Sequence, residues 1–253
     1  MVHLAALPGT PNAHLSVDQI ADFAAAEARV LINTGFDAVI VENMHDRPYV
    51  NGRKPPEIVA AMTRAALAVR ANAQTVGIQV LSGGNQEALA IAQATSLDFI
   101  RCENFVFAHV GDEGLQPTAE AGPLLRYRKS IGAENIKVFC DIKKKHASHA
   151  ITADISISES VEAAEFFGAE GIIITGTATG KPAAKSDLSA ARKTTKLPIL
   201  IGSGVTPDQV QPLFDFGANA LIVGSWIKKD GLWTNPVDPD RCELLVKARK
   251  SRA

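Results

Sequence analysis

Eight short runs rich in Val, Ile and Leu recur along this chain, and a helix-like or helix-sized segment follows each of them. The runs cover residues 2–7, 38–41, 76–81, 99–102, 136–140, 171–175, 198–201 and 220–223. Continuous apolar runs are typical of parallel strands that are covered on both faces. Strands that alternate with helices indicate a parallel sheet. Eight such units in 253 residues favour a closed (β/α)₈ TIM barrel over an open doubly wound sheet.

Helical periodicity and end signals place the helices between these runs. Ser16 is a good N-cap, and Ile20, Ala24, Ala28 and Leu31 follow it at helical spacing. Proline opens other segments, as at Pro207. We expect helices over residues 17–34, 55–69, 85–95, 118–130, 158–167, 186–194, 207–216 and 240–250. Two long loops are expected after the fourth and fifth strands, the second over about residues 143–156.

Composition adds constraints on domain number and partners. No linker or low-complexity tract interrupts the chain, so one domain over residues 1–253 is expected. The net charge of −1 shows no basic bias that would call for a nucleic-acid partner. Cys102, Cys140 and Cys242 are widely spaced and are expected to be reduced, buried thiols. We find no apolar run of membrane-spanning length and no signal-peptide pattern, so a cytoplasmic location is expected, with a homo-oligomer as an open possibility.

The active site of this fold lies at the carboxyl ends of the strands. Polar residues directly after the apolar runs are therefore site candidates, and those before them are not. The candidates, in chain order, are His3, Glu42, Asn43, residues 82–84, Arg101, Glu103, Asn104, Asp141, Lys143, Lys145, His146 and residues 175–180.

The two last strands give the sharpest signal. Strand seven runs into Gly202-Ser203-Gly204, and strand eight runs into Gly224-Ser225. Glycine lets the backbone approach a ligand and present its N–H groups, and the loops after strands seven and eight are the usual phosphate site of the fold. We therefore predict that these residues, with Gly176, bind a phosphorylated small molecule. The alternative is that the glycines only make tight turns.

The loop after strand five carries the candidate acid–base groups. Asp141, Lys143 and Lys145 would share one side if the strand stays extended that far. A lysine beside other cations can act as a base or a nucleophile, and His146 could carry a proton. The basic run could equally be a solvated surface, and His146 could be structural.

Glu42 and Arg101 are the candidates from the first half of the chain. Glu42 could act as a general base, and Arg101 could hold a carboxylate or phosphate or pair with Glu103. A divalent metal held by Glu42, Glu103, Asp141 and His146 is a weaker alternative, because no local spacing motif supports it. No cofactor is predicted.

Several segments resemble the BtpA family in order along nearly the whole chain. They are MVHLAALPG at residues 1–9, GFDAVIVEN at 35–43, LLRYR at 124–128, Asp141 with KHA at 145–147, TGTATG at 175–180, GSGVT at 202–206 and NPVDPDR at 235–241. The resemblance implies a ribulose-phosphate-binding-barrel-like (β/α)₈ fold, related to phosphate-binding barrels such as the tryptophan synthase α subunit.

The chain departs from the family pattern in two places. Family members usually have several residues before the Met-Val-His-Leu match, so strand one is expected to be short here. Residues 102–109 also differ from the Val-Asn-Val-His-Thr-Gly-like pattern of bacterial members, which indicates a diverged branch.

Two functions are consistent with these features. The first is an enzyme of lyase, aldolase or isomerase type that acts on a phosphorylated metabolite. In it Glu42 or Asp141 would move a proton, Lys145 would stabilise negative charge and His146 would assist. The second, which the resemblance to the BtpA family suggests, is a non-enzymatic assembly or stability factor of the kind proposed for photosystem I biogenesis. A barrel can lose its chemistry and keep its shape. Charged residues at the strand ends favour the enzyme.

Overall fold

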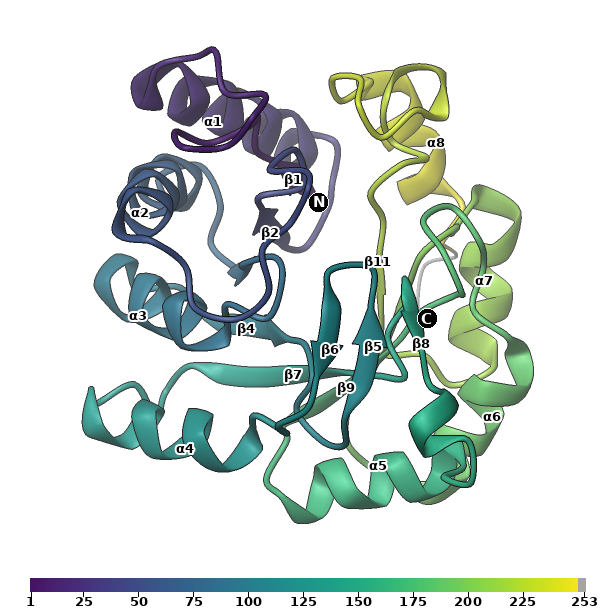
Figure 1. Cartoon of the computed structure of the whole chain (residues 1–253). Helices are drawn as coiled ribbons and strands as arrows, with labels where there is room; N and C mark the ends of the chain where they lie inside the picture. Colours follow the sequence, from purple (N-terminus) through teal and green to yellow (C-terminus); the bar gives the residue numbers. More distant parts are fainter. Residues whose placement is uncertain (250–253) are drawn as a thin grey trace. The chain divides into compact units, whose positions relative to one another are not determined.

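The structure, a computed structural model, describes residues 1–249. Eight strands form one parallel sheet in the order β1-β2-β3-β4-β7-β9-β10-β11, and helices follow them along the chain (Figure 1). The strands are β1 Val2–His3, β2 Val39–Glu42, β3 Val76–Gln79, β4 Phe99–Cys102, β7 Lys137–Ile142, β9 Gly171–Ile174, β10 Ile199–Gly202 and β11 Ala220–Ile222. The predicted (β/α)₈ architecture is confirmed.

The helices lie where the sequence predicts them, within a few residues. They are α1 Val17–Asn33, α2 Pro56–Arg70, α3 Asn85–Thr95, α4 Ala121–Ser130, α5 Ile157–Phe166, α6 Lys185–Thr194, α7 Pro207–Asp215 and α8 Pro239–Lys247. The Ser16 hydroxyl caps α1 by accepting a hydrogen bond from the Gln19 N–H, as its sequence position predicts. The last helix was predicted to end at residue 250, which lies outside the described residues.

A second, smaller sheet occupies the two segments that were predicted as long loops. Its strands are β5 His109–Gly111, β6 Gly114–Gln116 and β8 Ala147–Ser148, in the order β6-β5-β8. Both pairings are antiparallel (Figure 1). Two- and three-residue strands are too short to show a periodicity, and β8 finds its partner more than thirty residues away.

The described chain divides into two compact units. Unit 1 comprises Met1–Glu103 and Gly122–Val138. Unit 2 comprises Asn104–Ala121 and Phe139–Ala253, of which residues 250–253 are outside the described structure. The single domain over residues 1–253 stays a prediction.

Strand register sorts the side chains of unit 1 onto two faces. Val2, Val41, Ile78 and Ile100 are in register across β1 to β4 and are all aliphatic. The next positions are His3, Glu42, Gln79 and Arg101, which are all polar and point to the opposite face. In this fold one face of the sheet packs on the helices and the other lines the interior. The polar row therefore lines the interior at the carboxyl ends of the strands.

The cysteines and the helix lengths bear on two further expectations from the sequence. Cys102, Cys140 and Cys242 are buried free thiols, as predicted. Burial raises the pKa of the Cys140 thiol, and the neighbouring Asp141 adds to the effect. Within residues 1–249, no helix is long and apolar enough to cross a membrane.

Candidate functional site

Unit 2 contains a set of unpaired hydrogen-bond donors at the ends of β10 and β11, which we call the cradle. It comprises Ser203, Gly204, Gly224 and Ser225. Their peptide N–H groups have no hydrogen-bond acceptor within the described residues. The Ser203 hydroxyl oxygen is buried and is also without a partner there. These are the two loops that the sequence identifies as the phosphate site.

The backbone of the cradle depends on glycine. Ser203 and Gly204 have φ angles of 69° and 63°, in the left-handed region that favours glycine. A Cβ on Gly204 would lie 2.7 Å from the carbonyl oxygen of Gly180. The loop after β9 therefore packs directly against the cradle. Gly176, at the start of that loop, is equally confined, because its Cβ would lie 2.0 Å from the Lys181 carbonyl oxygen.

The three threonines of this β9 loop hold Lys145 and His146. The Lys145 N–H donates to the Thr175 hydroxyl at 3.1 Å, and the His146 N–H donates to the Thr177 carbonyl at 3.2 Å. The Lys145 ammonium donates to the Thr179 hydroxyl at 3.2 Å. One loop thus contacts both the cradle and the two predicted acid–base residues.

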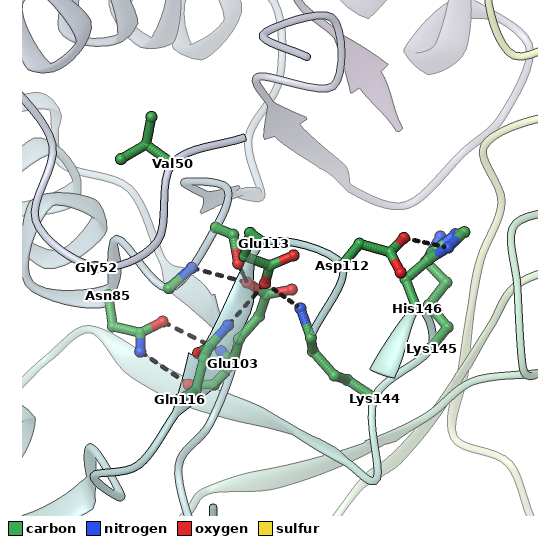
Figure 2. Close-up of polar contacts among 12 residues, drawn as sticks. Val50, Gly52, Asn85, Glu103, Asp112, Glu113, Gln116, Lys144, Lys145 and His146 are labelled. Carbon is green, nitrogen blue, oxygen red and sulfur yellow. Dashed lines mark hydrogen bonds and ion pairs between the residues drawn. The ribbon is translucent and has the colours of Figure 1, made fainter. Parts of the chain in front are cut away.

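The hydrogen bonds of His146 determine its tautomer. The Thr179 peptide N–H donates to His146 Nε2 at 3.1 Å, so Nε2 must carry a lone pair. The proton of the neutral ring is then on Nδ1, which lies 3.4 Å from the Asp112 carboxylate (Figure 2). Burial lowers the pKa of His146 and the Lys145 charge lowers it further, while Asp112 opposes both effects.

This geometry predicts the titration of His146. Its folded pKa lies below the ordinary value, so the unfolded chain binds the proton more readily. The contribution of His146 to stability is therefore present above the unfolded pKa and is lost as the pH falls through the folded pKa. Histidine ¹⁵N NMR should show an Nδ1–H ring with a midpoint below that of the urea-unfolded chain. An Nε2–H ring, or a raised midpoint, would contradict the hydrogen bond from Thr179.

The prediction that Lys143 shares a side with Asp141 and Lys145 is wrong. Strand β7 ends at Ile142, and Lys143 has a φ of 45°, which breaks the extended geometry. Its ammonium instead donates to the carbonyls of Thr152 and Ile155, at the 3₁₀ turn η1 (Ala150–Thr152). Lys143 is therefore a structural residue.

Lys144 and Glu113 form a buried ion pair that the sequence did not indicate. The two groups lie 3.0 Å apart, and both side chains are nearly inaccessible to solvent (Figure 2). Gln116 donates a further hydrogen bond to the same carboxylate oxygen at 2.7 Å. The pair joins the small sheet to the end of β7, where Asp141 is also buried.

In unit 1, Glu42 is buried and lies 3.5 Å from the imidazole of His3. Arg101 is buried at the end of β4. The phenol of Tyr49 has a pKa raised by burial and, secondarily, by the charge of Glu42. The carboxylate of Glu42, which could act as a base, and the guanidinium of Arg101, which could bind an anion, are thus both present near the ends of these strands.

Glu103 is buried beside the start of α3. Its carboxylate accepts hydrogen bonds from the Gly83 N–H at 2.8 Å and from the Ser82 hydroxyl at 3.2 Å. The Asn85 side-chain amide donates a hydrogen bond to the Glu103 carbonyl oxygen and accepts one from the Glu103 N–H (Figure 2). Lys54, which the sequence did not single out, donates to the carbonyls of Val50, Gly52 and Ser82. These contacts fix the β2–α2 and β3–α3 loops, which is a structural role.

Asn43 and Asp46 brace the ends of the first three strands. Asn43 accepts from the Leu81 N–H at 2.7 Å and donates to Asp46 at 2.8 Å, and Asp46 accepts from the Leu7 N–H at 2.8 Å. Burial raises the pKa of Asp46, against the lowering effect of these hydrogen bonds. Asn43, predicted as a site candidate, thus has its polar groups used within the fold.

The sequence offered Glu42, Glu103, Asp141 and His146 as a weaker alternative, a divalent-metal site. Among residues 1–249, no group of three or more His, Cys, Asp or Glu side chains is arranged to hold a metal ion. Within unit 1, Glu42 is paired with His3 and Glu103 accepts hydrogen bonds from Ser82 and Gly83. We therefore propose no metal.

A sequence model of the BtpA family matches residues 1–251. The chain belongs to the BtpA family. A Caenorhabditis elegans member, named as mitochondrial, is 44% identical over 98% of this chain and 90% of its own length. The photosystem I biogenesis protein BtpA of Synechocystis is 32% identical over 98% of this chain and 86% of its own length. This BtpA-family chain's cytoplasmic location accordingly stays a prediction.

Solved structures of low sequence identity share the fold. The (S)-3-O-geranylgeranylglyceryl phosphate synthase of Thermoplasma acidophilum, in complex with sn-glycerol-1-phosphate, matches with a TM-score of 0.59 and 15% identity over 90% of this chain and 87% of its own. Orotidine 5'-phosphate decarboxylase of Pyrococcus horikoshii matches with a TM-score of 0.58 and 13% identity over 90% and 93%. At these identities the likeness establishes the fold of the BtpA-family chain.

Proposed function

We propose that this BtpA-family chain is an enzyme that binds a phosphorylated small molecule through the cradle. The main observation in support of this proposal is the set of four N–H groups and one hydroxyl at the ends of β10 and β11 that have no partner within the described residues. Neighbouring backbone donors without protein acceptors favour an anion. The proteins named above with the same fold, one of them holding a glycerol phosphate, support the phosphate as that anion.

The chemistry we propose is of lyase, aldolase or isomerase type. Lys145 would stabilise negative charge as it develops, because its ammonium is held by Thr179 in the loop that packs on the cradle. The neutral ring of His146 would take part in proton transfer beside it. Asp141, which is buried in the same unit, is the candidate general base. The roles of Glu42 and Arg101 in unit 1 stay predictions from the sequence.

A thermal-shift titration tests the binding step. Inorganic phosphate, glycerol phosphate and a nucleoside monophosphate should each be assayed with the full chain. A ligand at a hundred times its dissociation constant stabilises a protein by about 2.7 kcal/mol. That corresponds to a rise in Tm of about 5–10 °C for a chain of this size. If none of these compounds raises the Tm, the proposed function is wrong.

The name of the Synechocystis relative favours one alternative, an assembly factor without catalysis. That role would require a protein partner and would not require Lys145. A Lys145→Ala variant that still complements a deletion strain would support the assembly factor, and one that fails to complement while folding normally would support the enzyme.

A further inference from the structure

A side-chain amide that the proposed function does not use is buried in unit 1. Gln79 is the last residue of β3 and is 2% exposed. Its Oε1 is inaccessible and has no hydrogen-bond partner, and its Nε2 also makes no hydrogen bond within the described residues. An unsatisfied buried polar group is destabilising, so its retention calls for an explanation.

The neighbours of Gln79 show that it belongs to a polar surface. Glu42 is in register with it on β2, and Arg101 occupies the corresponding position on β4. Both are buried, and both point to the same face as Gln79. One step toward the start of the strand on that face, Gly77 leaves room for the ring of Phe99, which would lie 2.1 Å from a Cβ at that position. The neighbouring position on the Gln79 face is therefore filled by the apolar ring of Phe99, which we call the apolar floor.

The chemistry of the amide restricts what can satisfy it. Oε1 needs a donor and Nε2 needs an acceptor. An ammonium group only donates, and a carboxylate or a fully ionised phosphate monoester only accepts, so neither satisfies both atoms. A hydroxyl group does both. One acidic and one basic residue flank Gln79, so its immediate surroundings favour no net charge on the ligand.

We propose that Gln79 is a specificity residue that binds a hydroxyl group of an uncharged polyol or of the polyol part of a ligand. The hydroxyl donates to Oε1 and accepts from Nε2, and the carbon that bears it packs toward the apolar floor. Glu42 and Arg101 flank the bound group on either side. This inference rests on unit 1 alone and does not require the phosphate cradle.

The test uses Gln79→Met, which keeps the length of the side chain and removes both polar atoms. Glycerol, erythritol and D-ribose are titrated into the full chain, and binding is followed by ligand-observed NMR. Gln74→Met is the matched control, since Gln74 is exposed just before β3. At least one polyol should bind the native chain and the control, and its affinity should fall at least tenfold in Gln79→Met.

The same variant has a second readout that a structural role would not produce. Removing an unpartnered buried amide should raise the Tm of the free protein, by about 2–4 °C, while polyol binding falls. A fall in Tm or failure to fold would mean that the amide stabilises the protein and would overturn the proposal. Unchanged polyol affinity in Gln79→Met, or no binding of any of the three polyols, would overturn it as well. Neither outcome bears on phosphate binding at the cradle, so the polyol proposal and the proposed function can be overturned independently.

Discussion

Replacement of Glu113 by leucine is expected to lower the free energy of unfolding by about 3–5 kcal/mol, because Lys144 would remain buried without its carboxylate. The hydrogen bond from the Gln116 amide to Glu113 would be lost at the same time. Urea denaturation measures the loss. The double variant Glu113→Leu, Lys144→Met should recover much of it, since a buried ion pair can be replaced by apolar side chains of similar volume with little change in stability.

An exposed pair provides the control for this experiment. Lys129 and Glu134 also form an ion pair, but both side chains are largely accessible to solvent. Lys129→Met should leave the unfolding midpoint within experimental error, because exposed pairs contribute little. A Glu113→Leu variant as stable as the native chain would show that the small sheet is not held to the end of β7 by this pair.

Gly204→Asp should weaken phosphate binding at least about a hundredfold, since like charges placed together cost several kcal/mol. The new Cβ also meets the Gly180 carbonyl oxygen at 2.7 Å, in a backbone conformation with a φ of 63°. The β9 loop must then move, and with it the contacts from Thr175 and Thr179 to Lys145 and His146. Calorimetric titration with inorganic phosphate measures the effect on the cradle.

Two further variants separate charge from backbone strain. Gly204→Asn adds a side chain of the same shape without the charge, and should weaken binding less than Gly204→Asp. Gly132→Asp introduces the same residue at a φ of 66° with no atom within 4 Å of its Cβ, and so controls for the left-handed conformation alone. Gly132→Asp should bind phosphate as the native chain does. If Gly204→Asp bound phosphate as tightly as the native chain does, the cradle would not be the phosphate site.

The fold was predictable because the strands are short runs of mostly apolar residues and the helices carry their own periodicity. Ser16 and Pro207, for example, mark the starts of α1 and α7 within one residue. The small sheet was not predictable, because β5, β6 and β8 are too short to carry a period and depend on pairing between distant segments. The end of β7 was also missed, since the positive φ of Lys143 leaves no mark in a run of lysines.

The candidate site was predictable from the sequence only where the order of the strands in the fold indicates which loops bind phosphate. Gly202 to Gly204 and Gly224-Ser225 follow directly from the rule that phosphate lies after strands seven and eight. Asp112 was not identified, and Thr179 was a candidate only as part of residues 175–180, because their contacts with His146 come from separate loops. Gln79 was missed because the third strand was predicted to run to residue 81, which placed Gln79 inside the strand and not at its end. The register of β2, β3 and β4, which aligns it with Glu42 and Arg101, could have indicated it.

A crystal structure with inorganic phosphate would show whether the cradle binds a phosphoryl group. We expect tetrahedral density within hydrogen-bond distance of the N–H groups of Ser203, Gly204, Gly224 and Ser225, with the Ser203 hydroxyl donating to the same anion. Density at that place in the native chain should be lost in Gly204→Asp. A phosphate bound elsewhere, or an empty cradle at a concentration that saturates binding in solution, would contradict the account.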